Sequence, residues 1–312
     1  MAKIVVTDKV NPIGPELLKG AGHEIVYLNS RSSEELAEKI KDCDGVLSRG
    51  LRITADMIKS AANLKIISKH GVGYDNIDIE AAKSQGVIVT ITPGANSLAV
   101  AEHAFTLLMA SAKHAFMVAQ KYKTIGFEAK NSTEGVEITG KTLGVIGCGK
   151  IGSLVAKMAF GGFNMRVLVY DPYIEKTPEG TIRVDSLEGL LSQSDFVTLH
   201  TPLTSETRQI INANALKMMK PTAFLINSAR GEVVDEAALI SALKDGIIAG
   251  AGLDVVYPEP PAADHPLFFM ENVILTPHFA PCTKETAANV SRISCENLIA
   301  YFSGKEPIGR II

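Results

Sequence analysis

The sequence predicts an α/β protein with two domains, and three observations support this prediction. Short apolar segments alternate with helical patterns along most of the chain, which is typical of parallel sheets covered by helices. The chain has 312 residues, more than one compact core usually holds. The alternation is interrupted once, near residue 96, and a second α/β series begins at Lys141. We therefore expect two parallel-sheet domains.

The first series contains five apolar segments that predict strands, at 3–7, 24–28, 45–48, 65–68 and 87–90. Helices are expected at 32–42 and 54–63, because each begins with Ser or Thr and has acids in its first turn. Residues 96–121 predict one long helix that is apolar around most of its circumference. Such a helix must be buried between layers, domains or subunits. Residues 122–139 are polar and irregular, which indicates a loop or linker.

The second series predicts six strands, at 142–147, 165–170, 196–200, 223–228, 248–256 and 272–277. Helical segments separate them; one at 235–246 has acids in its first turn and Gly246 at its end. A final helix is expected at about 283–302 and is assigned back to the first domain. The predicted domains are therefore 1–97 plus 283–312, and 98–282.

Composition excludes several classes of function. The net charge is −3, so no basic surface indicates nucleic acid or an anionic membrane as a partner. No signal segment or membrane-spanning apolar run is found. The four cysteines are scattered and form no CxxC pair, which argues against a metal site and against a disulfide framework. Reduced thiols fit a cytoplasmic protein.

A glycine motif in the second series predicts a dinucleotide site. Gly147, Gly149 and Gly152 form GxGxxG after an apolar strand and before a helix, which is the context that this motif requires. The helix start offers unpaired N–H groups to a pyrophosphate. Asp171 ends the next strand, where an acid would bind the adenosine ribose and repel a 2′-phosphate. NAD is therefore expected rather than NADP, in a Rossmann-type doubly wound sheet.

Hydride transfer to a ketone needs a proton donor, and His278 is the candidate. It ends a strand of the second series, and Arg230 and Glu259 lie at or just after the ends of two others. Ligands of open α/β sheets bind at these ends. Arginine can grip neighbouring carboxylate and carbonyl oxygens, and a carboxylate beside the histidine would hold its tautomer. Each residue alone is more often structural than functional, but their shared placement favours a catalytic site.

Seven motifs are spread over nearly the whole chain: "KHGVGYDNIDIEAAKSQGV", "TPGANSLAVAEHAF", "TLGVIGCGKIGSLVA", "LHTPLTSETRQII", "INSARGEVVDEAAL", "AGLDVVYPEPP" and "LTPHFA". In these motifs and their order the chain resembles the D-isomer-specific 2-hydroxyacid dehydrogenases, and within them it looks most like the phosphoglycerate dehydrogenase and glycerate (hydroxypyruvate) reductase branch. The resemblance implies NAD as cofactor, a flavodoxin-like substrate domain beside the nucleotide domain, and a homodimer formed through the nucleotide domain.

The resemblance also implies roles for particular residues. An Arg–Glu–His triad falls on Arg230, Glu259 and His278. The residues implied at the cofactor are Val72, Gly147, Gly149, Lys150, Ile151, Gly152, Asp171, Thr201, Ser228, Ala229 and Asp254. Those implied at the substrate are Arg49, Gly71, Val72 and Gly73, where the glycine loop would offer backbone N–H groups to a carboxylate.

The sequence departs from the family where Phe279-Ala280-Pro281 follows the histidine, and it matches poorly over 122–139. The substrate stays open among glyoxylate, glycerate or hydroxypyruvate, 3-phosphoglycerate and sulfolactate types. Arg49 would bind a second anion of the substrate, or it is a surface arginine; the role of Arg52 is equally open. An alternative from another class is an NAD(H)-sensing, co-repressor-like binding protein of the same fold.

Overall fold

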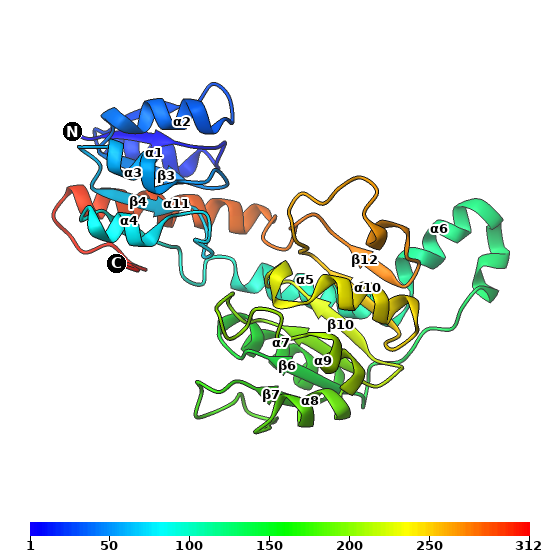
Figure 1. Cartoon of the computed structure of the whole chain (residues 1–312). Helices are drawn as coiled ribbons and strands as arrows, with labels where there is room; N and C mark the ends of the chain where they lie inside the picture. Colours follow the sequence, from blue (N-terminus) through cyan, green and yellow to red (C-terminus); the bar gives the residue numbers. More distant parts are fainter. The chain divides into compact units, whose positions relative to one another are not determined.

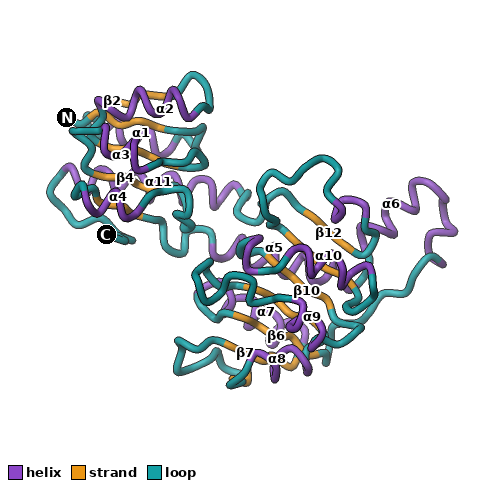
Figure 2. Tube along the Cα trace, viewed as in Figure 1, coloured by secondary structure: helices purple, strands orange, loops and turns teal.

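The structure, a computed structural model, describes residues 1–312, which divide into two compact units. Unit 1 contains Met1–Asn96 and Pro281–Ile312, and unit 2 contains Ser97–Ala280. Each unit is built on one all-parallel sheet covered by helices (Figures 1 and 2). The predicted α/β class with two parallel-sheet domains is therefore confirmed.

The sheet of unit 1 has the strand order β2-β1-β3-β4-β5. This is the flavodoxin-like order, in which the chain adds strands first on one side of β1 and then on the other. Its strands are β1 (Lys3–Val6), β2 (Glu24–Tyr27), β3 (Gly45–Ser48), β4 (Ile66–Lys69) and β5 (Ile88–Thr90). Its helices are α1 (Ile13–Gly20), α2 (Ser33–Lys39), η1 (Ile40–Asp42), α3 (Ala55–Ser60), α4 (Ile79–Ser84) and α11 (Lys284–Phe302).

Side-chain caps fix where four of these helices begin. Ser32, Thr54, Asp78 and Thr283 each accept a hydrogen bond from the backbone N–H three residues later. The C-terminal helix α11 packs against α1, and a Cβ added at Gly14 would lie 2.4 Å from the carbonyl oxygen of Ser291. The Ser291 hydroxyl also donates to the carbonyl of Asn11 at 2.6 Å. Because α11 packs this closely on α1, the last helix belongs to unit 1.

The sheet of unit 2 has the order β12-β11-β10-β9-β6-β7-β8. This is the Rossmann order with one further strand. All strands are parallel, and the order in which the chain adds them to the sheet reverses between β6 and β9. Its strands are β6 (Thr142–Ile146), β7 (Arg166–Tyr170), β8 (Thr181–Arg183), β9 (Phe196–Leu199), β10 (Phe224–Asn227), β11 (Gly250–Leu253) and β12 (Val273–Leu275). Its helices are α5 (Ser97–Ala112), α6 (Ala115–Ile125), η2 (Gly126–Asn131), α7 (Lys150–Phe163), α8 (Leu187–Gln193), α9 (Ala213–Met218), η3 (Gly231–Val233), α10 (Glu236–Lys244) and η4 (Pro266–Phe269).

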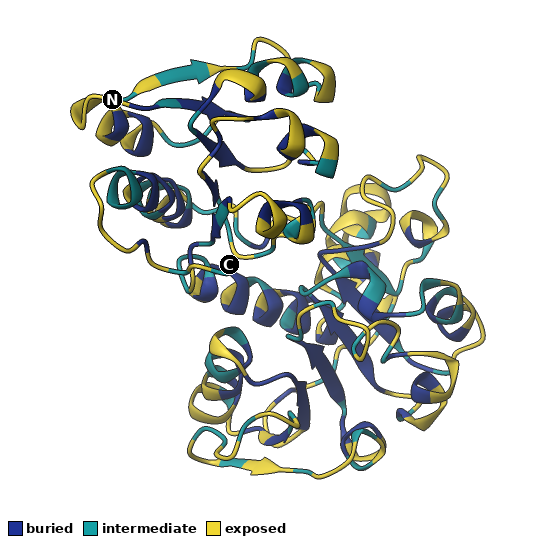
Figure 3. Ribbon diagram, turned by 60° about the vertical axis from the view of Figure 1, so that its left-hand side comes forward, coloured by how far each residue is buried: buried dark blue, intermediate teal, exposed yellow.

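Both faces of the central strands of unit 2 are buried, as continuous apolar strands require. On β10, Leu225 belongs to one apolar core, and Phe224 and Ile226 belong to the core on the opposite face. Figure 3 shows these strands buried and the outer helix surfaces exposed. Polar groups therefore collect at the strand ends, where the chain leaves the sheet.

The prediction of one long helix over 96–121 is wrong. The segment forms two helices, α5 and α6, because His114 adopts a left-handed backbone conformation with φ 49°. Helix α5 is buried along most of its length, whereas α6 has no buried residue. The strand β8 was also not predicted; it is a three-residue edge strand with two exposed positions.

Candidate active site

The glycine loop after β6 has the geometry of a phosphate-binding turn. Gly147 has φ 84°, and a Cβ there would lie 2.9 Å from the backbone of His200. A Cβ at Gly152 would lie 2.1 Å from the carbonyl oxygen of Gly147, so this glycine allows helix and loop to pack closely. A Cβ at Gly149 meets nothing within 4 Å. The middle glycine thus borders open space rather than protein.

The helix α7 begins at Lys150 with Gly149 as its N-cap and has no side-chain cap. The N–H groups of its first turn are therefore available to an anion, and the helix dipole favours negative charge there. Asp171, directly after β7, accepts hydrogen bonds from the N–H of Cys148 at 2.8 Å and from the N–H of Tyr173 at 2.9 Å. Its carboxylate therefore lies beside the glycine loop.

Two buried hydroxyls follow the neighbouring strands. Thr201 Oγ1 comes after β9 and Ser228 Oγ after β10, and neither has a hydrogen-bond partner. Buried polar atoms without partners are rare, because each costs about 1–3 kcal/mol. Together with the uncapped start of α7, they fit a bound dinucleotide that supplies hydrogen-bonding groups at these positions. Ala229, the next residue, donates its N–H to the side chain of Asn227 at 2.9 Å.

His278 and Glu259 form a pair. The Nδ1 of His278 lies 2.9 Å from Oε2 of Glu259, and the other carboxylate oxygen accepts from the N–H of Val256 at 3.3 Å. Both side chains are partly exposed, 45% for His278 and 38% for Glu259. Because Nδ1 faces the carboxylate, Nε2 is the ring nitrogen left to face a reactant.

Arg230 lies three residues after the end of β10, the strand next to β11. Its Nη1 donates to the carbonyl of Ala229 at 2.7 Å, and its own carbonyl accepts from Asn227 Nδ2 at 2.8 Å. The three predicted catalytic residues thus follow β10, β11 and β12, which are adjacent in the sheet. The structure directly joins His278 to Glu259, and it places Arg230 at the same edge.

The backbone at His278 is held in an unusual conformation. Its φ is 52°, in the left-handed region that costs a non-glycine residue about 1–2 kcal/mol. Asp254 is 1% exposed, and its carboxylate accepts the N–H of Phe279 at 2.7 Å and of Ala280 at 2.9 Å. The carbonyl of Asp254 accepts the N–H of His278 at 2.8 Å. One buried residue thus holds three successive N–H groups of this turn.

Asp254 has two further donors that the sequence did not indicate. Thr276 Oγ1 lies 2.5 Å and His103 Nε2 3.3 Å from its Oδ1. Burial by itself raises the pKa of Asp254, but hydrogen bonds from His103, Thr276 and the two backbone N–H groups leave that pKa below its usual value. The His103 ring also lies 6.3 Å from the Phe279 ring, centroid to centroid. His103 comes from the apolar helix α5, where sequence alone favours packing.

The residues predicted at the substrate belong to unit 1. Gly71 has φ 143°, and its carbonyl accepts hydrogen bonds from the N–H of Thr92 at 2.9 Å and from its hydroxyl at 3.1 Å. Val72 and Gly73 follow in this loop, and Val72 is 36% exposed. Arg49 Nη1 donates to the carbonyl of Lys9 at 2.9 Å, while Arg52 is exposed.

The sequence did not single out Lys69, which joins the two substrate loops. This buried side chain donates to the carbonyl of Arg49 and, at 2.6 Å, to Asn76 Oδ1. Beside it, Ser48 Oγ and His70 Nε2 are buried and have no hydrogen-bond partner. Burial, aided by the charge of Arg49, lowers the pKa of His70 to about 4. The position of Lys69 next to the glycine loop was the available signal.

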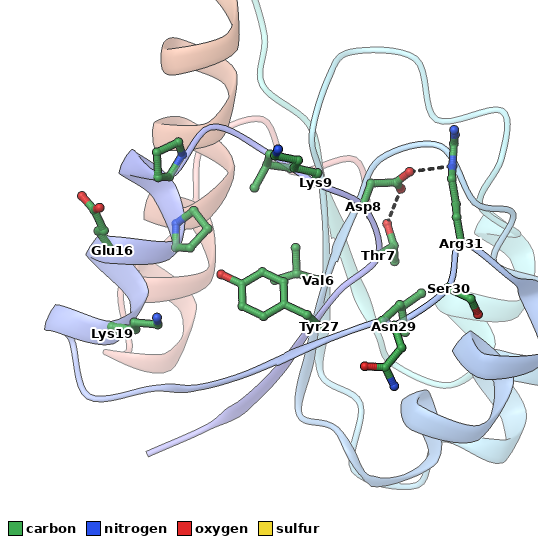
Figure 4. Close-up of a pocket in the computed structure, with 14 residues that line it drawn as sticks. Val6, Thr7, Asp8, Lys9, Glu16, Lys19, Tyr27, Asn29, Ser30 and Arg31 are labelled. Carbon is green, nitrogen blue, oxygen red and sulfur yellow. Dashed lines mark hydrogen bonds and ion pairs between the residues drawn. The ribbon is translucent and has the colours of Figure 1, made fainter.

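A pocket of about 550 Å³ also occurs in unit 1 (Figure 4). It lies at the carboxyl ends of β1 and β2, beside α1. Its floor includes Val6 and Tyr27, and Asp8 pairs with Arg31 at 2.8 Å on its rim. It contains none of the residues predicted for catalysis or cofactor binding.

No helix of the chain is long and apolar enough to cross a membrane.

Comparisons with known proteins show which family the chain resembles. Residues 105–280 match the family model of the D-isomer specific 2-hydroxyacid dehydrogenase, NAD binding domain. A D-3-phosphoglycerate dehydrogenase of Methanocaldococcus jannaschii is 41% identical over 309 residues, which are 98% of this chain and 58% of that protein. A glyoxylate reductase of Pyrococcus furiosus is 40% identical over 316 residues, which are 98% of this chain and 94% of that protein.

Solved structures show the same fold. The NAD⁺-bound 3-phosphoglycerate dehydrogenase of Entamoeba histolytica superposes with a TM-score of 0.85 at 30% identity, covering 100% of this chain and 98% of that one. The chain spans little more than half of the Methanocaldococcus relative and nearly all of the Pyrococcus relative. With a family model over most of unit 2 and these relatives, the chain belongs to the D-isomer specific 2-hydroxyacid dehydrogenase family of oxidoreductases and has its NAD(P)-binding fold.

Proposed function

We propose that the protein is an NAD-dependent dehydrogenase that interconverts a small D-2-hydroxy acid and the corresponding 2-oxo acid. The observation that carries the proposal is the His278–Glu259 pair, at 2.9 Å, on the strand-end edge that also holds the glycine loop. The relatives named above as a phosphoglycerate dehydrogenase and a glyoxylate reductase support the same reaction class.

The dinucleotide supplies or accepts the hydride when it is bound. The glycine loop with Lys150 and Ile151 would hold the pyrophosphate, and the hydroxyls of Thr201 and Ser228 would gain partners. We assign NAD rather than NADP because the Asp171 carboxylate lies beside the loop. A 2′-phosphate close to that carboxylate would be repelled.

His278 is the proposed proton donor and acceptor. With Nδ1 facing Glu259, its Nε2 donates a proton to the carbonyl oxygen of a 2-oxo acid, or removes the hydroxyl proton in the reverse direction. The Glu259 carboxylate stabilises the imidazolium form. Arg230 would bind the substrate carboxylate and carbonyl through its planar guanidinium group.

In unit 1, the Gly71-Val72-Gly73 loop would bind the substrate carboxylate through backbone N–H groups. Arg49 is proposed to bind a second anionic group of the substrate. Its guanidinium group lies near the carbonyl of Lys9, and Lys69 fixes its backbone carbonyl. If Arg49 has this role, a dianionic substrate, such as a phosphorylated or sulfonated 2-oxo acid, would be favoured over glyoxylate.

Large apolar side chains exposed on α6, a helix without a buried residue, support a homodimer formed through unit 2. Phe116, Tyr122 and Ile125 are 53%, 60% and 53% exposed, although they are large and apolar. Several large apolar side chains exposed on one short helix are typical of a segment that another protein chain covers. We assign a second copy of the chain as the partner, and cytoplasm as the location.

A substrate panel tests the proposal. Purified protein is mixed with NADH or NADPH and with glyoxylate, hydroxypyruvate, 3-phosphohydroxypyruvate or 3-sulfopyruvate, and cofactor oxidation is followed at 340 nm, the absorbance band of reduced nicotinamide. We expect turnover with NADH and fastest turnover with a dianionic substrate. Tight NADH binding without turnover of any 2-oxo acid would instead support the NAD(H)-sensing function.

A further inference from the structure

The polar network around Asp254 contains a histidine to which the proposed reaction assigns no role. His103 lies on α5, and its Nε2 is 3.0 Å from Thr276 Oγ1 and 3.3 Å from Asp254 Oδ1. These three residues are more than 20 positions apart in the sequence, and α5 packs on the sheet beside β11; a Cβ at Gly252 would lie 3.0 Å from Leu107 Cβ. Packing of α5 thus brings the imidazole to the turn that carries His278.

The proton inventory fixes how this histidine acts. The Thr276 hydroxyl has one proton, and its 2.5 Å contact with Asp254 Oδ1 commits that proton to the carboxylate. The hydroxyl can then only accept a hydrogen bond from His103. The ionised Asp254 carboxylate can also only accept. Nε2 of His103 must therefore carry a proton, and this N–H donates a hydrogen bond to the Thr276 hydroxyl and the Asp254 carboxylate.

The carboxylate at the centre of the network controls the backbone of the candidate proton donor. Its two oxygens receive the N–H groups of Phe279 and Ala280, directly after His278. The backbone at His278 is left-handed and depends on these bonds. A change in the position of the Asp254 carboxylate is therefore transmitted to the imidazole that faces Glu259.

We propose that His103 is a positioning residue for the proposed reaction. Its Nε2–H orients Thr276 and Asp254, and through them the turn that holds His278 against Glu259. His103 touches neither substrate nor cofactor in this role. The proposal rests on the proposed function because it concerns the placement of the proton donor. It extends that function by naming a donor outside the predicted triad.

The test compares two substitutions at one position in the full chain. His103→Leu fills similar space without a donor, whereas His103→Gln keeps an N–H donor of similar reach. Thr106→Ala, at an exposed position of the same helix, is the matched control. For each variant we measure kcat and KM with the best 2-oxo acid of the panel, the Kd for NADH by its own fluorescence, and amide hydrogen exchange at residues 278–280.

For His103→Leu we expect kcat to fall by roughly 10- to 100-fold, as a displaced catalytic group predicts. KM and the NADH Kd should stay within about threefold, because neither depends directly on the placement of a proton donor. The amides of Phe279 and Ala280 should exchange faster. His103→Gln should recover kcat to within about threefold of the wild type, and Thr106→Ala should match the wild type throughout.

Two results overturn the proposal in an active enzyme: wild-type kcat in His103→Leu, or a loss in His103→Gln as large as in His103→Leu. If the wild-type protein turns over no substrate of the panel, the proposed function fails separately. The exchange rates then decide the positioning role alone. Unchanged exchange at Phe279 and Ala280 in His103→Leu would reject it, and faster exchange that His103→Gln reverses would support it.

Discussion

His278 combines a strained backbone with a partly exposed ring. A left-handed non-glycine residue persists only where its surroundings hold it, and such residues gather at functional sites. Here the Asp254 carbonyl and carboxylate hold the N–H groups of residues 278–280. The ring is then presented to Glu259 and to solvent on one side of the turn. At this scale, the proposed proton transfer depends on a backbone fixed by a buried acid.

Replacing His278 with asparagine separates the ring from the turn. Asparagine tolerates the left-handed region better than most residues, so the fold around residue 278 should persist. We expect kcat to fall by about 10²- to 10⁴-fold, the usual contribution of general acid–base catalysis. Thermal unfolding and NADH binding should change little. A kcat within threefold of the wild type would remove His278 from the proton-transfer step.

Arg49→Ala tests whether the substrate carries a second anion. Loss of a charge-assisted hydrogen bond worth about 1.5–3 kcal/mol raises KM by roughly tenfold or more. The increase is expected for 3-phosphohydroxypyruvate or 3-sulfopyruvate and not for glyoxylate, which has only one carboxylate. Steady-state kinetics with both substrate types provide the internal control. An equal KM for the dianionic substrate in variant and wild type would place Arg49 outside the site.

At the scale of elements, the loop between β6 and α7 is where both the fold and the proposed cofactor site require glycine. The three glycines of this loop have different surroundings. Gly147 and Gly152 are in tight contact with neighbouring backbone, whereas Gly149 borders open space. The loop therefore combines two positions that the fold needs with one that the proposed cofactor would need. This difference separates effects on stability from effects on binding.

Gly149→Ala and Gly152→Ala should have opposite consequences. At Gly152, the new Cβ would lie 2.1 Å from the carbonyl oxygen of Gly147, so we expect a clear loss of thermal stability. At Gly149, φ is −70° and the Cβ meets no protein atom, so stability should be unchanged. NADH affinity should fall for Gly149→Ala, because the methyl group enters the space of the pyrophosphate. Calorimetry and NADH titration measure the two effects; unchanged affinity would place the cofactor elsewhere.

The elements also show what the sequence could and could not predict. The strands and the glycine loop follow from apolar runs and motif spacing, which are local signals. The break between α5 and α6 was missed because it depends on one left-handed residue, His114, within an apolar pattern. The strand β8 was missed because it is short and largely exposed. The contact of His103 with Asp254 was also missed, because residues 151 positions apart meet only after α5 packs on its sheet.

At the scale of the whole molecule, the proposed homodimer depends on contacts made by α6. Its apolar side chains are exposed in the chain by itself, so a dimer would bury them. Ile125→Lys, which introduces a charge into this surface, should convert dimer into monomer at micromolar concentration. Sedimentation velocity measures the result. Leu17→Lys, at an exposed apolar position of unit 1, is the matched control and should leave the dimer intact. A dimer that survives Ile125→Lys uses another surface.

Stability of both units should depend on pH through buried histidines. Burial lowers the pKa of His200 in unit 2 to about 3, and burial together with the charge of Arg49 lowers that of His70 in unit 1 to about 4. Below pH 6.5, the unfolded chain binds a proton at each ring that the folded chain does not bind. The free energy of unfolding should therefore fall as pH decreases from about 6.5, by up to about 1.4 kcal/mol per pH unit for each ring.

Urea unfolding between pH 7.5 and 5 measures this slope, and His200→Gln should reduce it because glutamine does not titrate. The acids with lowered pKa, Asp8, Glu35, Asp195 and Asp254, are ionised in both states over most of this range. Their contribution is lost mainly below about pH 5 and is the same in variant and wild type, so it cancels when the two slopes are compared. The substitution also changes stability at pH 7.5, and the comparison is therefore between slopes. An equal slope in variant and wild type would mean that His200 titrates in the folded protein much as it does in the unfolded chain.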